Sequence, residues 1–439
     1  MNYNIYIILN MDFKENLKRY LCDEEIEKLF SAQVQERTNS LILNTKKITK
    51  EEFIKKYNKV EEHPFLENVF YYDKNLYPFG KSYEFDNGEY YIMDASSLLI
   101  SHFLKIEDHD LVLDMCAAPG GKTISLVLNN LDKQFSVISN DISYQRSLEL
   151  SSNIEHLGFD NVLVTSNDFG KIYQNFYEKF DKIILDAPCS GSSMFRKNKL
   201  AKDDWSIEKV NRCAKIQTEL IEMAYFMLKK GGILSYSTCS FSYEENEEVV
   251  NRLLNNHSDM HLLPIKNENG FFFKEKDMLH IFPHLYKGEG QFLALLKKDC
   301  ETSSSQNKTK NTTQITHKDL LKEYNLNFSN EIVLKDTIYL NNFAFNYEKL
   351  NLIRPGLEAF KINKKIFTPT FALAHYLSTE NSIKLNEDEK NKYIHGEEIK
   401  KDLNLKNGYY TVSFENLNLG YVKYVDGKLK NFYPKGLRH

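Results

Sequence analysis

The middle of the chain alternates short apolar runs with stretches of helical spacing. Residues 119–131 and 144–158 repeat apolar side chains every three or four positions, as amphipathic helices do. Because repeated strand–helix units build a parallel sheet with helices on both faces, this part predicts an α/β, Rossmann-like domain. The expected strands are LVLDM (111–115), SVISND (136–141), VLVTSND (162–168), KIILD (182–186), GILSYST (232–238) and FLALLKK (292–298).

The two ends of the chain have other patterns. Residues 11–85 combine helical segments with the strand-like SLILNTKKI and predict a small N-terminal α+β domain of the RRM-like kind. Residues 300–317 are polar, as a linker is, and separate a domain at 86–299 from a C-terminal region at 318–439. That region ends in short alternating strands around a DG turn, which indicates a β-rich module of one or two subdomains.

Composition narrows the class of protein. The net charge is −4, and no apolar stretch approaches the ~18 residues of a membrane span, so we expect a cytoplasmic protein that binds no membrane. The opening MNYNIYIILNMDF has no basic region before its apolar patch and is not interpreted as a signal peptide. Met11 is a candidate start, with residues 1–10 as an extension.

The cysteines have no metal-binding or disulfide pattern. No CxxC occurs, so we expect no metal site, and a chain of this length without a secretion signal is expected to hold reduced thiols. Cys189 and Cys239 each follow an apolar run, in loops rich in small residues. Ligands of parallel sheets bind beyond the carboxyl ends of the strands, so these two thiols are expected to face one substrate. The alternative is that both are small core hydrophobes.

The loop LDMCAAPGGKT (113–123) joins an expected strand to an expected helix with small residues. It is not a P-loop, because Cys116 stands where that motif needs glycine, and it lacks the dinucleotide fingerprint. A nucleoside without pyrophosphate fits better: Asp141 suits ribose hydroxyls, and Asp168 suits an adenine amine. S-adenosylmethionine has both groups and no phosphate. Alternatively, these acids only cap the helices that follow them.

Three motifs together resemble the Nol/Nop/Sun family of RNA cytosine-C5 methyltransferases: CAAPGGK (116–122), DAPCSG (186–191) and STCSFSYEENEEVV (237–250). LNTKKITKEEF (43–53) and GEYYIMDASSLL (88–99) resemble the family's N-terminal segments. GYVKYVDGKLKNFYPKGLRH (420–439) is similar to the carboxyl end of the bacterial RsmF-type 16S rRNA enzymes, which implies a PUA-like RNA-binding domain.

The resemblance implies a role for each thiol. Cys239 attacks cytosine C6, so that C5 becomes nucleophilic enough to take a methyl group, and Cys189 assists release. Asp186 contacts the base near N3, and Lys122 lies in the same pocket. The implied S-adenosylmethionine site comprises Cys116, Ala117, Ala118, Pro119, Gly120, Gly121, Lys122, Asp141, Asp168 and Asp186.

The sequence departs from the family pattern at two places. Met93 stands where the family usually has Gln, and Ser192 and Ser193 follow the DAPCSG motif where it usually has Glu or Thr and then Gly. None of these removes a catalytic group, but each could alter how RNA is positioned.

Two basic stretches are candidates for RNA contact. Residues 195–215 carry seven Lys/Arg against three acids, and 421–439 carry five against one, with Tyr421, Tyr424, Phe432 and Tyr433 interleaved. Basic side chains suit phosphates, and aromatic rings suit unstacked bases. Solvated basic faces and a small β core are the alternatives. The expected RNA-binding residues are Arg196, Lys197, Lys199, Lys430, Lys435 and Arg438.

Together these features predict an S-adenosylmethionine-dependent RNA (cytosine-5-)-methyltransferase, acting as a monomer on 16S rRNA or the small ribosomal subunit. The alternatives are the same reaction on tRNA, a non-catalytic RNA-binding assembly factor, and a nucleotide-dependent switch.

Overall fold

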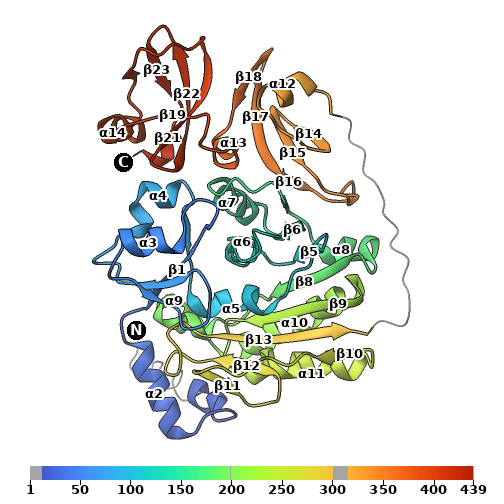
Figure 1. The fold of residues 1–439 in the computed structure, drawn as a ribbon. Helices are drawn as coiled ribbons and strands as arrows, with labels where there is room; N and C mark the ends of the chain where they lie inside the picture. Colours follow the sequence, from blue (N-terminus) through green and yellow to red (C-terminus); the bar gives the residue numbers. More distant parts are fainter. Residues whose placement is uncertain (1–11, 198, 300–314, 439) are drawn as a thin grey trace.

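The computed structural model describes residues 12–197, 199–299 and 315–438. The predicted extension at 1–10, Met11 and most of the predicted linker lie outside these residues. A ten-stranded sheet occupies the centre, in the order β11-β12-β13-β9-β8-β5-β6-β7-β16, with β10 also paired to β13 (Figure 1). Its strands are β5 (Leu111–Asp114), β6 (Ser136–Asn140), β7 (Val162–Thr165), β8 (Phe180–Asp186), β9 (Leu228–Thr238), β10 (Met260–Leu262), β11 (Phe271–Phe273), β12 (Met278–Ile281), β13 (Gln291–Lys298) and β16 (Leu352–Pro355).

The five strands from β9 to β7 are parallel, which confirms the predicted Rossmann-like core. The last expected strand, β13, pairs with β9 antiparallel and leads into β12 and β11. Apolar side chains of α6 and α7 pack on one face of the sheet, and those of α10 and α11 pack on the other. The helices are α5 (Ala95–Phe103), α6 (Gly121–Leu128), α7 (Tyr144–Glu155), α8 (Phe169–Ile172), α9 (Lys199–Asp203), α10 (Ile207–Met227) and α11 (Glu247–Asn256).

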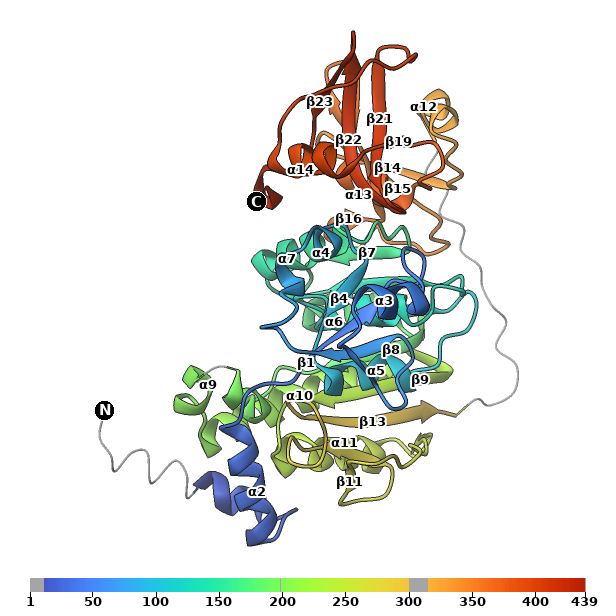
Figure 2. The same ribbon diagram turned by 60° about the vertical axis from the view of Figure 1, so that its left-hand side comes forward.

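The N-terminal part forms a four-stranded antiparallel sheet, in the order β2-β3-β1-β4. Thr49 is the N-cap of α3 and forms a capping box, in which its side chain accepts a hydrogen bond from the Glu52 amide. Phe53 of α3 packs against Phe70 of the sheet in one buried apolar cluster. Figure 2 shows α2 beside α9, and Leu29 of α2 lies in one apolar cluster with Trp205. The elements are β1 (Asn39–Leu43), β2 (Glu61–Glu62), β3 (Val69–Tyr72), β4 (Tyr90–Ile92), α2 (Asp23–Gln33), α3 (Lys50–Lys56) and α4 (Tyr83–Asp86).

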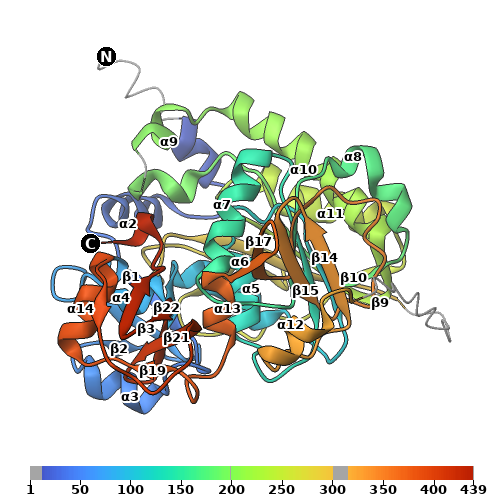
Figure 3. The same cartoon turned by 90° about the horizontal axis from the view of Figure 1, so that it is seen from above.

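The C-terminal part contains two further sheets, which lie side by side over the rest of the molecule when seen from above (Figure 3). One has the order β14-β15-β17-β18 and the other β19-β21-β22-β23-β20. Their strands are β14 (Asn330–Leu334), β15 (Thr337–Asn341), β17 (Leu357–Asn363), β18 (Ile366–Pro369), β19 (Ile383–Lys384), β20 (Ile399–Lys400), β21 (Gly408–Phe414), β22 (Leu417–Val425) and β23 (Lys428–Asn431), and their helices are α12 (Lys318–Glu323), α13 (Phe371–Tyr376) and α14 (Glu387–His395).

Short 3-10 helices complete the fold: η1 (Phe79–Lys81), η2 (Tyr173–Phe176), η3 (Ser192–Arg196), η4 (Tyr243–Glu245) and η5 (Lys435–Leu437). Strand β16 was not expected from the sequence. It leaves the C-terminal part and extends the central sheet by pairing antiparallel with β7. Within the described ranges, no helix is long and apolar enough to cross a membrane.

Candidate active site

Two thiols meet where neighbouring parallel strands end. Strands β8 and β9 run in register, with Asp186 opposite Ser237, so the loops that follow them leave the sheet side by side. These loops bring Cys189 Sγ to 2.8 Å from Cys239 Sγ, and both cysteines are free and half-buried. The chain therefore gathers two reduced thiols at one point beyond the sheet, which isolated core cysteines would not require.

Asp186 at the end of β8 is held on both oxygens. Its Oδ2 pairs with Lys122 Nζ at 2.5 Å. Its Oδ1 accepts hydrogen bonds from Ser237 Oγ at 2.8 Å and Gln291 Nε2 at 3.0 Å. Gln291 was not predicted; its signal in the sequence is only that it stands just before the last expected strand, 292–298. The carboxylate is thus fixed in direction beside the thiols.

The two thiols differ in how strongly they hold a proton. The pKa of Cys239 is lowered, first because the Cys189 thiol donates a hydrogen bond to it, and further because of the positive charge of Lys122. The same hydrogen bond, together with burial, raises the pKa of Cys189. Burial alone would lower the pKa of Lys122, but Asp186, together with Cys239 and Asp114, outweighs burial and raises it, so this side chain stays cationic. Cys239 is therefore the more acidic thiol of the pair.

A buried carboxylate ties the two cysteine loops together. Glu245 is fully buried, and burial raises its pKa even though several donors lower it. Its Oε1 accepts from the Ser190 amide at 2.8 Å and from Gln217 Nε2 at 3.0 Å, and its Oε2 accepts from the hydroxyls of Ser190 and Ser240. Ser190 follows Cys189 and Ser240 follows Cys239, so one side chain sets the spacing of both loops.

The residues that depart from the family pattern also hold these loops. Ser192 Oγ accepts from the Phe241 amide at 2.7 Å, and the Ser193 amide donates to the Cys239 carbonyl oxygen at 3.0 Å. Met93 packs on the small-residue loop, where a Cβ on Gly121 would lie 3.2 Å from its sulfur. The departures thus support the loops from within the protein.

The loop 116–121 joins β5 to α6 and lies at the ends of β5 and β6. Gly120 is the N-cap of α6 with φ of 116°, a conformation that favours glycine. The Ala117 amide donates to the Asn140 carbonyl oxygen at 2.7 Å. Cys116 is half-buried, and burial raises the pKa of its thiol, so it is suited to packing rather than to attack.

Of the two acids after β6 and β7, only Asp168 caps the helix that follows it, because Ser143 is the N-cap of α7. Asp141 Oδ1 accepts from the Ser143 amide at 2.9 Å, while Oδ2 pairs with Arg146 at 3.2 Å. Asp168 caps α8 by accepting from the Gly170 amide at 3.0 Å. Capping and ligand binding are compatible, because a carboxylate oxygen accepts more than one hydrogen bond. Their contact with a cofactor stays a prediction.

Asp114 is a further strand-end acid, which was not among the predicted cofactor residues. It is fully buried at the end of β5, and its Oδ2 accepts from Thr123 Oγ1 at 2.7 Å. Its Oδ1 has no hydrogen-bond partner among the described residues. This edge of the sheet suits a nucleoside better than a polyphosphate. Acids follow three neighbouring strands, and one buried carboxylate oxygen lacks a partner among the described residues. The nearby Lys122 is already paired with Asp186. The described residues contain no cluster of three or more metal-ligand side chains.

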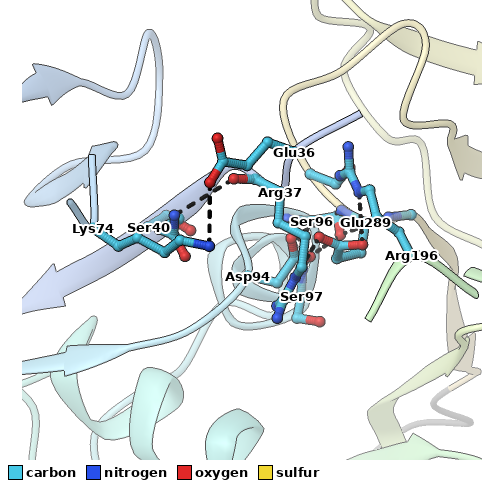
Figure 4. A network of polar contacts seen from close by, with 12 residues as sticks. Glu36, Arg37, Ser40, Lys74, Asp94, Ser96, Ser97, Arg196 and Glu289 are labelled. Atoms are coloured by element: carbon cyan, nitrogen blue, oxygen red, sulfur yellow. Dashed lines mark hydrogen bonds and ion pairs between the residues drawn. The ribbon is translucent and has the colours of Figure 1, made fainter. Parts of the chain in front are cut away.

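Arg196 is a correction to the predicted RNA contacts. Its side chain is only 8% exposed. Its Nε donates a hydrogen bond to Glu289 Oε2 at 3.0 Å, and its Nη2 donates to the Gly288 carbonyl oxygen at 2.9 Å. Glu289 also receives Arg37, as Figure 4 shows, and its amide donates to Asp94 at 2.9 Å. The guanidinium is thus paired inside the protein, which the number of charged residues in residues 195–215 does not reveal.

The other predicted RNA contacts have mixed surroundings. Lys197, Lys430 and Lys435 are exposed, and their contact with RNA stays a prediction. Lys199 lies in α9, but its side chain is outside the described part of the chain. Arg438 is half-buried and donates to the Tyr433 carbonyl oxygen at 3.0 Å.

The aromatic rings of the C-terminal tail, residues 421–439, lie mostly in the hydrophobic core. Tyr421, Tyr424 and Tyr433 are buried, and only Phe432, at 42% exposure, keeps a free face among the four. The expectation of base stacking is therefore wrong for the three tyrosines, because their rings fill the interior of the β module.

Comparison with known proteins agrees with these features. Residues 101–297 match the model for 16S rRNA methyltransferase RsmB/F, residues 9–95 match the N-terminal domain of 16S rRNA methyltransferase RsmF, and residues 380–439 match the methyltransferase RsmF PUA domain. Ribosomal RNA small subunit methyltransferase F of Vibrio cholerae is 30% identical over 91% of this chain and 90% of its own. The protein of that name from Vibrio parahaemolyticus is 28% identical over 100% of this chain and 98% of its own.

Solved structures share the fold. A methyltransferase homolog from Pyrococcus horikoshii has a TM-score of 0.57 and 28% identity, covering 68% of this chain and 100% of its own. NSun6 from Pyrococcus horikoshii, solved with SFG, has a TM-score of 0.59 and 22% identity, covering 66% of this chain and 98% of its own. With the match to the Vibrio cholerae enzyme extending over nearly the whole chain, this protein belongs to the RsmB/F family of 16S rRNA methyltransferases, with the N-terminal and PUA domains of RsmF.

Proposed function

We propose that this methyltransferase modifies C5 of a cytosine in 16S rRNA, with Cys239 as nucleophile. The observation that carries the proposal is the thiol pair, in which Cys239 has the lowered pKa and Cys189, 2.8 Å away, has the raised one. Cytosine C5 is too weak a nucleophile to be methylated directly, and covalent addition at C6 overcomes this. Methylation of a ring nitrogen or a ribose hydroxyl would require no second thiol.

The Cys239 thiolate adds to C6, and the electron pair of the C5–C6 double bond shifts to C5 and, through C4, towards N3. Asp186 lies beside the thiols and is proposed to bind the base near N3, while Lys122 offsets the negative charge that accumulates there. Ser237 and Gln291 keep the carboxylate in one orientation during this step. C5 then carries the electron density needed to take a methyl group.

S-adenosylmethionine supplies the methyl group when it is bound. We assign its site to the loop 116–121 with Asp141, Asp168 and Asp186, and Asp114 is a further acid at the same edge. After transfer, water takes the proton from C5, the electron pair of the C5–H bond re-forms the C5–C6 double bond, and the C6–S bond breaks and returns its electron pair to Cys239. The Cys189 thiol donates to the departing thiolate, as it does in the resting pair.

The geometry of this site also bears on the three alternative functions. Cytosine methylation of tRNA would use identical chemistry, and only the family membership favours rRNA. A non-catalytic assembly factor would not need a thiolate, an oriented carboxylate and a lysine in one place. A nucleotide-dependent switch is disfavoured because Lys122 is paired with Asp186.

The test is methylation with isotope-labelled S-adenosylmethionine, offered separately to naked 16S rRNA, small ribosomal subunits and tRNA from cells lacking the enzyme. Nucleosides are then identified by mass spectrometry. We expect labelled 5-methylcytidine from 16S rRNA in one of the two ribosomal forms. Label in another nucleoside would refute the chemistry, and label in tRNA alone would refute the substrate.

A further inference from the structure

The C-terminal part reaches the edge of the sheet where the cofactor is assigned. Strand β16 pairs with β7, next to which it lies in Figure 2, with Leu352 opposite Thr165 and Pro355 opposite Leu163. It thereby covers the last strand of the parallel core, whose following loop carries Asp168. The matches to family domain models end at residue 297 and resume at 380, so this segment lies between them.

Asn351, just before β16, is bonded to that loop by both backbone and side chain. Its amide donates to Asn167 Oδ1 at 2.9 Å, and its carbonyl oxygen accepts from the Ser166 amide at 3.0 Å. Its side-chain Nδ2 donates to the Ser166 carbonyl oxygen at 3.2 Å. Three bonds thus fix the two residues immediately before Asp168.

Asn167 passes this restraint to the other strand ends. Its amide donates to Asn140 Oδ1 at 2.9 Å, and its carbonyl oxygen accepts from Asn140 Nδ2 at 3.1 Å. Asn140 Nδ2 also donates to the Met115 carbonyl oxygen at 3.3 Å, next to the loop 116–121. A continuous series of hydrogen bonds therefore runs from Asn351 to the ends of β7, β6 and β5.

We propose that Asn351 is a positioning residue of the S-adenosylmethionine site, through which the C-terminal part sets the loop that carries Asp168. The inference rests on the cofactor site assigned above. It makes the C-terminal part a component of the cofactor pocket as well as a carrier of RNA-binding side chains.

The segment is anchored independently of the Asn351 amide group. Phe343, Tyr347 and Leu350 are buried in the apolar cluster on the α10 face of the sheet. Asn351 itself is exposed. Removing its side-chain amide should therefore loosen the loop without releasing the segment or unfolding the domain.

The experiment compares Asn351→Ala with Asn346→Ala, an exposed asparagine of the same segment whose side chain bonds only locally, to the Glu348 amide. Isothermal titration calorimetry measures S-adenosylmethionine binding, and hydrogen exchange measures the Ser166 and Asn167 amides in the unliganded protein. Loss of one partly exposed hydrogen bond predicts a Kd raised about three- to tenfold and faster exchange at these amides. KM for S-adenosylmethionine should rise by the same factor, while KM for RNA should stay at the wild-type level.

Asn351→Asp is the second variant, because it keeps the size of the side chain but replaces the donor by an acceptor. The inference is overturned if both Asn351 variants melt like the wild type and bind S-adenosylmethionine with wild-type Kd, or if Asn346→Ala weakens binding equally. If the wild type itself binds no S-adenosylmethionine, the assigned cofactor site fails instead, and the two failures are distinguished.

Discussion

The Sγ atoms of Cys189 and Cys239 lie 2.8 Å apart although 50 positions separate the two residues. Parallel pairing of β8 and β9 causes this proximity, because it sends both following loops to the same edge of the sheet. The thiols are not equivalent: one hydrogen bond lowers the pKa of Cys239 and raises that of Cys189. Variants of the groups that maintain this asymmetry should therefore change the reaction in defined ways.

The pH dependence of adduct formation should reflect the lowered pKa of Cys239. Its thiolate is present above that pKa, so the single-turnover rate should rise with pH, with a midpoint below that of an ordinary thiol. Because the charge of Lys122 contributes to the lowering, Lys122→Met should move the midpoint up, with a larger deficit at pH 7 than at pH 9. The exposed Lys266→Met is the control. A deficit that does not change with pH would contradict this role for Lys122.

Glu245→Gln should loosen both cysteine loops. An amide cannot accept from all four donors of Glu245, so at least one buried donor is left unpaired, at a cost of about 1–3 kcal/mol in the free energy of unfolding. Urea denaturation measures this loss, and the single-turnover rate should fall as well. Glu248→Gln, which removes an exposed pair with Arg252, should change neither by much. Wild-type stability and rate in Glu245→Gln would show that the carboxylate does not hold the loops.

Asp114 should make stability depend on pH. Burial raises its pKa to about 7, although the Thr123 hydrogen bond lowers it. Between about pH 4 and about pH 7, the folded protein keeps a proton on Asp114 that the unfolded chain has released. The free energy of unfolding therefore falls as the pH rises through this range. Asp114→Asn should gain stability relative to wild type at pH 8 and little at pH 4. An equal effect at both pH values in urea denaturation would contradict the raised pKa.

Arg196 and the lysines of the tail should have separable effects. Arg196→Gln leaves Glu289 buried with one partner fewer and should lower the free energy of unfolding by about 3 kcal/mol.

Lys430→Gln with Lys435→Gln should leave the free energy of unfolding unchanged. It should reduce the log–log slope of RNA affinity against salt concentration by about 1 for each phosphate that is no longer neutralised. Fluorescence anisotropy at several salt concentrations measures the slope. An unchanged slope in the lysine variant would remove the tail from the RNA interface.

The sequence predicted what depends on local pattern. Strand-length apolar runs placed Cys189, Cys239 and Asp186 at one edge of a parallel sheet, and the chain folds in this way. What it did not predict depends on residues far apart. Arg196 has the character of a surface charge until Glu289, 93 positions away, is seen to bind it. Glu245 gives no sign from its neighbours that it will hold two loops.

Strand β16 illustrates the same limit. It consists of only four residues, LIRP, and a proline is unusual within a strand, so periodicity could not identify it. Its partner β7 is provided by a different part of the chain. The contribution of Asn351 to the cofactor edge follows only from the tertiary structure.

The central claim, that Cys239 forms a bond with RNA and Cys189 assists its release, is tested most directly by trapping. Cys189→Ala protein is incubated with S-adenosylmethionine and ribosomal RNA from cells lacking the enzyme, and the products are separated on a denaturing gel. We expect a covalent protein–RNA band that is absent in the Cys189→Ala/Cys239→Ala double variant. Absence of the band in Cys189→Ala, under conditions where the wild type transfers methyl groups, would contradict the division of roles between the two thiols.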